Sequence, residues 1–135
     1  MKTHLFSGPN RVLNPGQTKG SSVVSRLISL MQRIPRTPRI ECKDAVALMQ
    51  SKWKNNKSAA MFSFTGGLFE DNRLKDEFLY HTVAVLKTEK AYYIADPTYY
   101  QFKPAKDFLI SQTAPNEVAL LRGLQQIYGG KWYPM

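Results

Sequence analysis

Three side chains that together can perform nucleophilic chemistry lie far apart in this sequence: Cys42, His81 and Asp96. A thiolate attacks carbonyl carbon, an imidazole can hold the thiol in its thiolate form, and a carboxylate can orient the imidazole. The chain contains no other cysteine, so Cys42 cannot take part in an intramolecular disulfide. These residue types indicate a Cys-His-Asp catalytic triad, provided that the fold brings them together.

The cysteine falls at the predicted start of a helix. Apolar residues at helical spacing predict a helix that begins near Glu41 or Cys42 and ends near Trp53. At a helix N-terminus, the dipole and the free N–H groups stabilise a thiolate and lower the pKa of the thiol. Cys42 therefore has the placement of a reactive cysteine.

The histidine and the aspartate fall on two neighbouring predicted strands. Residues 78–87 and 91–96 are rich in β-branched and aromatic side chains, and residues 88–90 between them predict a short turn. This turn pairs positions whose numbers add up to about 178, so His81 should face a residue near position 97. Asp96 is then a direct or diagonal cross-strand neighbour of His81, within side-chain reach.

The remaining patterns predict helices on a small antiparallel sheet, which is an α+β fold. We expect residues 1–20 to be a flexible basic leader and residues 21–135 to form a single domain. The other expected elements are a helix from Ser21 or Ser22 to Ile34, a strand over 61–64 ending at Gly66-Gly67, a loop over 68–77, an edge or return strand at 99–102, a short helix over 104–111 and a helix over 115–128 ended by Gly129-Gly130.

The net charge of +9 is concentrated at the N-terminus. Residues 1–40 contain seven lysines and arginines and no acidic residue, whereas residues 41–135 are nearly balanced. Such a segment suits an acidic surface, a phospholipid membrane, nucleic acid or a secretion signal, or is simply solvated. The sequence shows no secretory signal peptide, no apolar run long enough for a membrane span and no metal-ligand or nucleotide-binding motif, so we expect no cofactor and no metal.

Two segments resemble a known superfamily. The stretch HTVAVLKTEKAYYIADPTYY resembles the His-to-Asp block of papain-like and transglutaminase-like cysteine enzymes, and IECKDAVALMQSKW resembles their cysteine-bearing helix. The separations, 39 residues from Cys42 to His81 and 15 from His81 to Asp96, are most similar to those of bacterial papain-fold toxins that deamidate glutamine on host proteins. The resemblance implies a papain-like core with the N-terminal helices packed on the sheet.

The resemblance also implies roles for individual residues. Cys42 would form a thioester with a glutamine side chain, His81 would protonate the leaving ammonia and activate water, and Asp96 would orient His81. The backbone N–H of Cys42 would supply one oxyanion donor. Papain-like proteases place a glutamine a few residues before the cysteine, but here the nearest upstream glutamine is Gln32, which is the candidate for the second donor. This departure favours a deamidase or a transferase over a general protease.

Three functions follow as hypotheses. The first is a monomeric, secreted or host-delivered deamidase that acts on a glutamine-bearing protein. The second is a cysteine protease or transglutaminase of the same fold. The third is a non-catalytic module whose basic N-terminal arm binds nucleic acid or membrane and whose cysteine is incidental; such binding should weaken steeply with salt.

Overall fold

The computed structural model describes residues 11–12, 22–35, 41–55, 58–67, 80–102 and 107–135. Within these ranges the strands form one six-stranded sheet in the order β1-β5-β4-β3-β2-β6, and each neighbouring pair is antiparallel. The strands are β1 Arg11–Val12, β2 Ala59–Gly67, β3 Tyr80–Thr88, β4 Tyr92–Asp96, β5 Leu109–Thr113 and β6 Trp132–Pro134, and the helices are α1 Ser22–Gln32, α2 Cys42–Lys52, α3 Glu117–Tyr128 and the short 3-10 helix Tyr99–Gln101.

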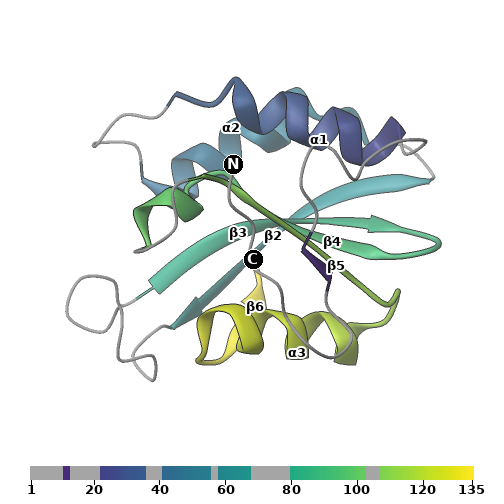
Figure 1. The fold of residues 1–135 in the computed structure, drawn as a ribbon, viewed down its shortest axis with the longest axis vertical. Helices are drawn as coiled ribbons and strands as arrows, with labels where there is room; N and C mark the ends of the chain where they lie inside the picture. Colours follow the sequence, from purple (N-terminus) through teal and green to yellow (C-terminus); the bar gives the residue numbers. More distant parts are fainter. Residues whose placement is uncertain (1–10, 13–21, 36–40, 56–57, 68–79, 103–106) are drawn as a thin grey trace.

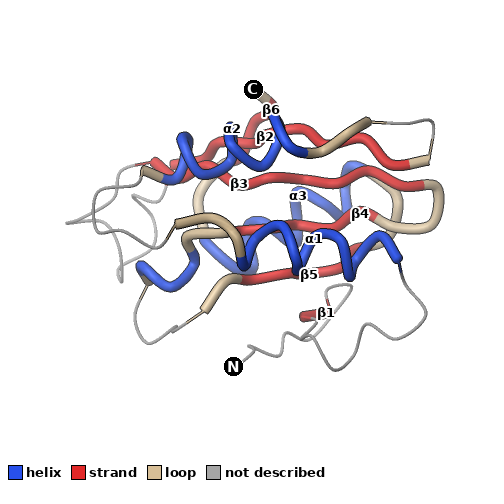
Figure 2. The backbone as a smooth tube through the Cα atoms, turned by 90° about the horizontal axis from the view of Figure 1, so that it is seen from above, coloured by secondary structure: helices blue, strands red, loops and turns tan. Residues whose placement is uncertain are grey.

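Helices cover both faces of the sheet. Helices α1 and α2 lie side by side on one face, and α3 lies on the other (Figures 1 and 2). Alternate residues of β3 point to the two layers: Ala84 and Leu86 pack with α1 and α2, whereas Val83 and Val85 pack with α3. Burial on both faces explains why β3 is apolar along most of its length instead of alternating with polar residues.

The sequence predicted the α+β class and most of these elements. The three helices and the strands β2, β3 and β4 are confirmed, with ends that differ from the predicted ones by a few residues. Helix α3 ends at Tyr128 and is followed by Gly129 and Gly130, whose φ angles of 77° and 70° favour glycine. The predicted loop over 68–77 and most of the predicted leader lie outside the described residues, but Arg11–Val12 of that leader pairs with β5.

The predicted helix over residues 104–111 is wrong where the structure describes it. Residues from Leu109 onward form β5, which pairs with β4 on one side and β1 on the other. Ile110 packs against the layer of α1 and α2, and Leu109 packs against α3. A short apolar run that is buried on both faces shows no strand alternation, so it is easily mistaken for part of a helix.

The predicted strand at residues 99–102 is also wrong, because the chain turns after β4. Pro97 has no N–H to offer a ladder, and the carboxylate of Asp96 accepts a hydrogen bond from the N–H of Thr98 at 3.0 Å. The chain then forms the 3-10 helix Tyr99–Gln101. This turn brings Phe102 back against the start of β3.

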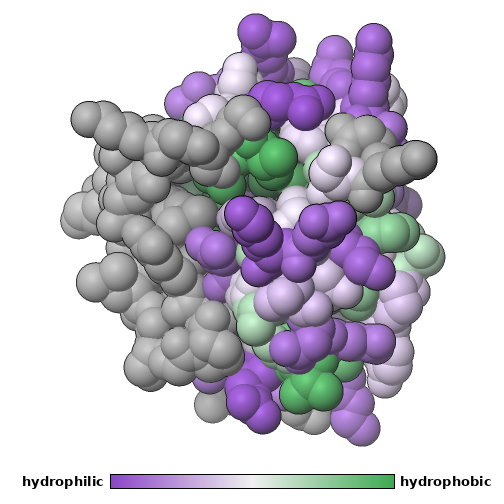
Figure 3. Space-filling view, turned by 90° about the vertical axis from the view of Figure 1, so that its right-hand side faces the viewer, coloured by the Kyte–Doolittle hydropathy of each residue, from purple (hydrophilic) through white to green (hydrophobic). Residues whose placement is uncertain are grey.

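The surface around the β3–β4 turn is mainly hydrophilic, with smaller apolar areas between the polar side chains (Figure 3). Among the residues that the structure describes, no helix is both long and apolar enough to cross a membrane.

The end of the sheet near His81 depends on a close approach between two strands. Gly66 of β2 pairs with both His81 and Trp132, and a Cβ atom on Gly66 would lie 2.3 Å from the Trp132 indole. Trp132 is buried, and its Nε1–H donates to the carbonyl of Gly129 at 2.8 Å, so the indole has little freedom to move away. Glycine at position 66 is therefore required for the indole to lie against the sheet.

We expect Gly66→Ala to lower the free energy of unfolding by about 1–3 kcal/mol, because the added methyl group overpacks a buried site. Denaturant unfolding measures the change. The control is the same substitution in a Trp132→Leu background, where a smaller side chain leaves space for the methyl group and the cost should fall. An equal cost in both backgrounds would show that the indole contact is not the cause.

Candidate active site

His81 and Asp96 form a buried pair at the open end of the β3–β4 hairpin. His81 Nε2 lies 2.7 Å from Asp96 Oδ2, and their side chains are 1% and 0% exposed. The β3–β4 ladder runs from Ala84 opposite Ala95 to Lys87 opposite Tyr92, so paired numbers add up to 179, one more than predicted. Extending that register makes His81 a diagonal neighbour of Asp96, as expected.

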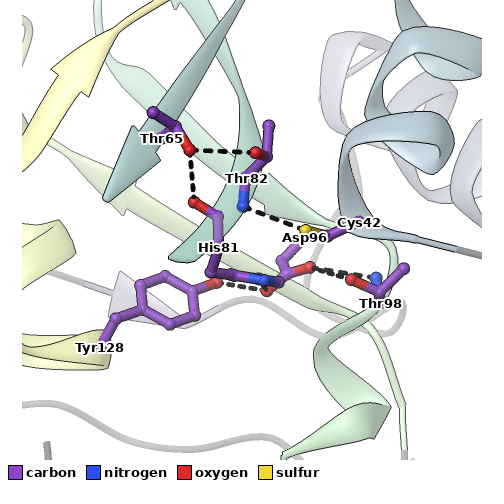
Figure 4. A network of polar contacts seen from close by, with 7 residues as sticks. All are labelled: Cys42, Thr65, His81, Thr82, Asp96, Thr98 and Tyr128. Atoms are coloured by element: carbon purple, nitrogen blue, oxygen red, sulfur yellow. Dashed lines mark hydrogen bonds and ion pairs between the residues drawn. The ribbon is translucent and has the colours of Figure 1, made fainter. Parts of the chain in front are cut away.

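The carboxylate of Asp96 is surrounded by hydrogen-bond donors (Figure 4). Oδ1 accepts the N–H of Thr98 at 3.0 Å and its hydroxyl at 3.3 Å. Oδ2 accepts the Tyr128 hydroxyl at 2.5 Å in addition to His81 Nε2. Because an ionised carboxylate only accepts, Nε2 must carry a proton, which leaves Nδ1 of His81 for the thiol.

Cys42 lies at the point where β3 extends beyond β4. The β3–β4 ladder stops at Ala84, although β3 continues back to Tyr80 alongside β2. The N–H of Thr82 donates to Cys42 Sγ at 3.4 Å instead of to a strand (Figure 4). Cys42 is the first residue of α2 and is partly exposed.

The electrostatics of this cluster favour a charged Cys–His pair. Burial of Cys42 raises its pKa, but a hydrogen bond and the charge from His81 and the N–H of Thr82 outweigh burial, so the pKa falls below its ordinary value of 9.0. Burial of His81 lowers its pKa, but the adjacent Asp96 carboxylate reverses this and raises the pKa to about 9. Both shifts therefore favour the thiolate–imidazolium form of the pair over the neutral form.

Aromatic rings and a hydrogen bond to its backbone carbonyl fix the position of His81. The centroids of the Phe102 and Tyr128 rings lie 4.6 and 5.2 Å from that of the imidazole, and Trp132 lies 6.4 Å away. The Thr65 hydroxyl donates to the carbonyl oxygen of His81 at 3.1 Å. These contacts restrict rotation of the imidazole and keep water from its Asp96 side.

The structure places Gln32 at the last residue of α1, where it is exposed. None of the described hydrogen bonds joins it to the triad, so its role as an oxyanion donor stays a prediction. The N-terminus of α2 is the better-placed source of donors, because the first N–H groups of a helix have no partner within it. In α2 the N–H of Asp44 is the first that bonds back, to the carbonyl of Glu41.

The sequence interpretation missed three residues that hydrogen-bond to the side chains of the triad. Thr98 had a signal, because Asp-Pro-Thr after a strand favours a side-chain-capped turn. Thr82 and Tyr128 had none: the first acts through its backbone, and the second has the spacing of an ordinary core position of α3.

Comparison of the chain with protein-family models, with curated proteins and with solved structures gave no match. Within the described residues, no three His, Cys, Asp or Glu side chains gather as metal ligands would. The basis for inferring a function is the geometry of the site, in which a thiol, an imidazole and a carboxylate lie together.

We expect Cys42 to react with iodoacetamide well below pH 9.0, the ordinary pKa of a thiol. In His81→Ala the hydrogen bond and charge that stabilise the thiolate are lost while burial remains, so the pKa of Cys42 should rise. The alkylation rate measured against pH reports this shift. The matched control is His4→Ala, which removes the other histidine of the chain. Identical profiles for wild type and His81→Ala would contradict the pairing of Cys42 with His81.

We expect Asp96→Asn to lower the pKa of His81 from about 9 by roughly one unit or more, because burial is then no longer offset by a carboxylate. An NMR titration of the imidazole C–H signals measures this pKa, with Asp107→Asn as the control.

The pKa of His81 lies above its ordinary 6.5, so the His81–Asp96 pair stabilises the fold fully below pH 6.5 and loses this contribution as the pH rises through about 9. Asp96→Asn should remove this pH dependence of the free energy of unfolding, which denaturant unfolding at several pH values measures. An unchanged pKa of His81 in Asp96→Asn would contradict the pairing of His81 with Asp96.

Proposed function

We propose that this protein is a cysteine-dependent hydrolase that deamidates glutamine side chains of a target protein through a thioester on Cys42. The observation that carries the proposal is that Cys42 Sγ accepts the N–H of Thr82, the residue after His81, at 3.4 Å, while His81 Nε2 lies 2.7 Å from Asp96 Oδ2. Together with a thiol pKa that His81 lowers and a partly exposed Cys42, this arrangement supports nucleophilic attack on a carbonyl group.

In the first half of the reaction, the thiolate of Cys42 attacks the carbon of the glutamine carboxamide. The C–N bond breaks, and His81 gives its Nδ1 proton to the departing nitrogen, which leaves as ammonia. Asp96 keeps the Nε2 proton in place and stabilises the imidazolium before transfer. The products are a thioester on Cys42 and a neutral His81.

In the second half, His81 Nδ1 accepts a proton from water while the water oxygen attacks the thioester carbon. The C–S bond breaks, Cys42 leaves as a thiolate, and the side chain becomes a glutamate carboxylate after it loses its proton. The enzyme then again holds the thiolate–imidazolium pair. The backbone N–H of Cys42, at the N-terminus of α2, would stabilise the oxyanion of both tetrahedral intermediates, with Gln32 as the proposed second donor.

The resemblance to bacterial papain-fold toxins supports a wider proposal about context. The protein would act as a secreted effector on a protein inside another cell, and its basic N-terminal segment would contact membrane or serve in delivery. The substrate would be a protein and not nucleic acid, because the proposed reaction consumes the side-chain carboxamide of a glutamine.

Deamidation is tested by incubating the protein with a blocked Gln-Gly dipeptide and with dimethylated casein, and measuring ammonia and intact mass. We expect ammonia release and a gain of about one mass unit for each converted glutamine, as replacement of NH₂ by OH requires. Reaction in ¹⁸O-labelled water should place the label in the new carboxylate. Cys42→Ala should abolish both signals, with His4→Ala as the control that keeps them.

Other outcomes identify the alternatives. Cleavage of the casein backbone would indicate a protease, and incorporation of an added primary amine in place of water would indicate a transglutaminase. If the wild-type protein forms no Cys42 thioester and releases no ammonia on a panel of glutamine-bearing proteins, although its thiol is reactive, the deamidase proposal is wrong.

A further inference from the structure

We propose that Tyr128 is a fourth member of the site, a positioning residue whose hydroxyl regulates how tightly Asp96 holds the His81 proton. The proposal deepens the function proposed above, and only its consequence for catalysis rests on that function. It stands on the direct contact of the Tyr128 hydroxyl with the same carboxylate oxygen, Oδ2, that binds His81 Nε2.

Tyr128 can only donate in this contact. Its side chain is 0% exposed, and its partner is a carboxylate, which has no proton to give. Burial and the neighbouring Asp96 carboxylate raise the pKa of Tyr128 well above the ordinary 10, so the phenol keeps its proton throughout the working range of the site. The hydroxyl is therefore a permanent donor to Asp96.

The Tyr128 hydroxyl is a second hydrogen-bond donor to Oδ2, and it weakens the hydrogen bond that Oδ2 accepts from His81 Nε2. The phenol hydrogen bond draws negative charge on Oδ2 toward Tyr128, so the carboxylate stabilises the imidazolium less than an unshared carboxylate would. His81 must release a proton to the leaving group and later accept one from water, and both steps need a pKa near the working pH. Tyr128 thus keeps His81 from becoming too weak an acid.

The position of Tyr128 supports a dedicated role. It is the last residue of α3, 32 residues after Asp96, and it reaches Asp96 from the side opposite Thr98 (Figure 4). Its ring also contacts the imidazole and Trp132, with centroids 5.2 and 5.0 Å apart. Phenylalanine would keep these ring contacts and remove the hydroxyl alone, so the two roles of Tyr128 can be separated.

The titratable groups around His81 are known and can be controlled. Asp96 faces it from β4, Cys42 from α2 and Tyr128 from α3, while Tyr99 of the 3-10 helix acts on Tyr128. A Cys42→Ala background removes the coupled titration of the thiol. It also makes the measurement independent of enzymatic activity, so that failure of this proposal and failure of the proposed function are distinguishable.

The test is an NMR titration of the His81 imidazole in the Cys42→Ala background. We expect Tyr128→Phe to raise the His81 pKa by roughly half a unit or more, since the carboxylate loses a competing donor. The matched control is Tyr133→Phe, the same change on an exposed tyrosine of β6, which should leave the titration unchanged.

A second variant covers the case in which Tyr128→Phe does not fold. Incorporation of 3-fluorotyrosine at position 128 by codon suppression makes the phenol a stronger donor with almost no change in shape, and should lower the His81 pKa. Shifts of opposite sign in the two variants are what a positioning role requires and what loss of packing cannot produce. If His81 titrates in the fluorotyrosine protein as it does in the parent, or if both variants shift it in the same direction, the proposal is overturned.

Discussion

The site is organised around one fully buried carboxylate. Removing Asp96 from water is expensive unless every lone pair is used, and the structure supplies four donors: two from Thr98, one from His81 and one from Tyr128. These donors come from β3, from the turn after β4 and from α3. Satisfying a single charge therefore fixes three separate parts of the fold relative to each other.

The sheet leaves space for the thiol of Cys42 near the Asp96 carboxylate. Strands β3 and β4 pair only from Ala84 and Ala95 toward their turn, while β4 stays paired with β5 up to Asp96. Beyond that point the N–H of Thr82 is directed to Cys42 at the start of α2. A ladder that continued to the end of both strands would have used this N–H and left no place for the sulfur. The early end of pairing thus makes room for Cys42 beside β3.

Much of this arrangement could be predicted from the sequence, because it depends on local patterns. The helix that presents Cys42 follows from its periodicity, and the approach of His81 to Asp96 follows from a short turn that fixes the register to within one residue. The role of Tyr128 could not be predicted, because it depends on how α3 docks on the far face of the sheet. Strand β5 was missed for a related reason: Leu109 and Ile110 are buried against different layers, so the run carries no alternation.

The contacts of strand β6 have a consequence for the order in which the protein folds. Trp132 packs beside His81 and pairs with Gly66, a partner 66 positions earlier in the chain, and Tyr128 contacts Asp96 from 32 positions later. Contacts across such long separations form late, after the local helices and the β3–β4 hairpin. Until α2 docks on β3, Cys42 lacks the influence of His81 and Thr82 that lowers the pKa of its thiol. The lowered pKa is therefore a property of the assembled fold and not of the cysteine-bearing helix alone.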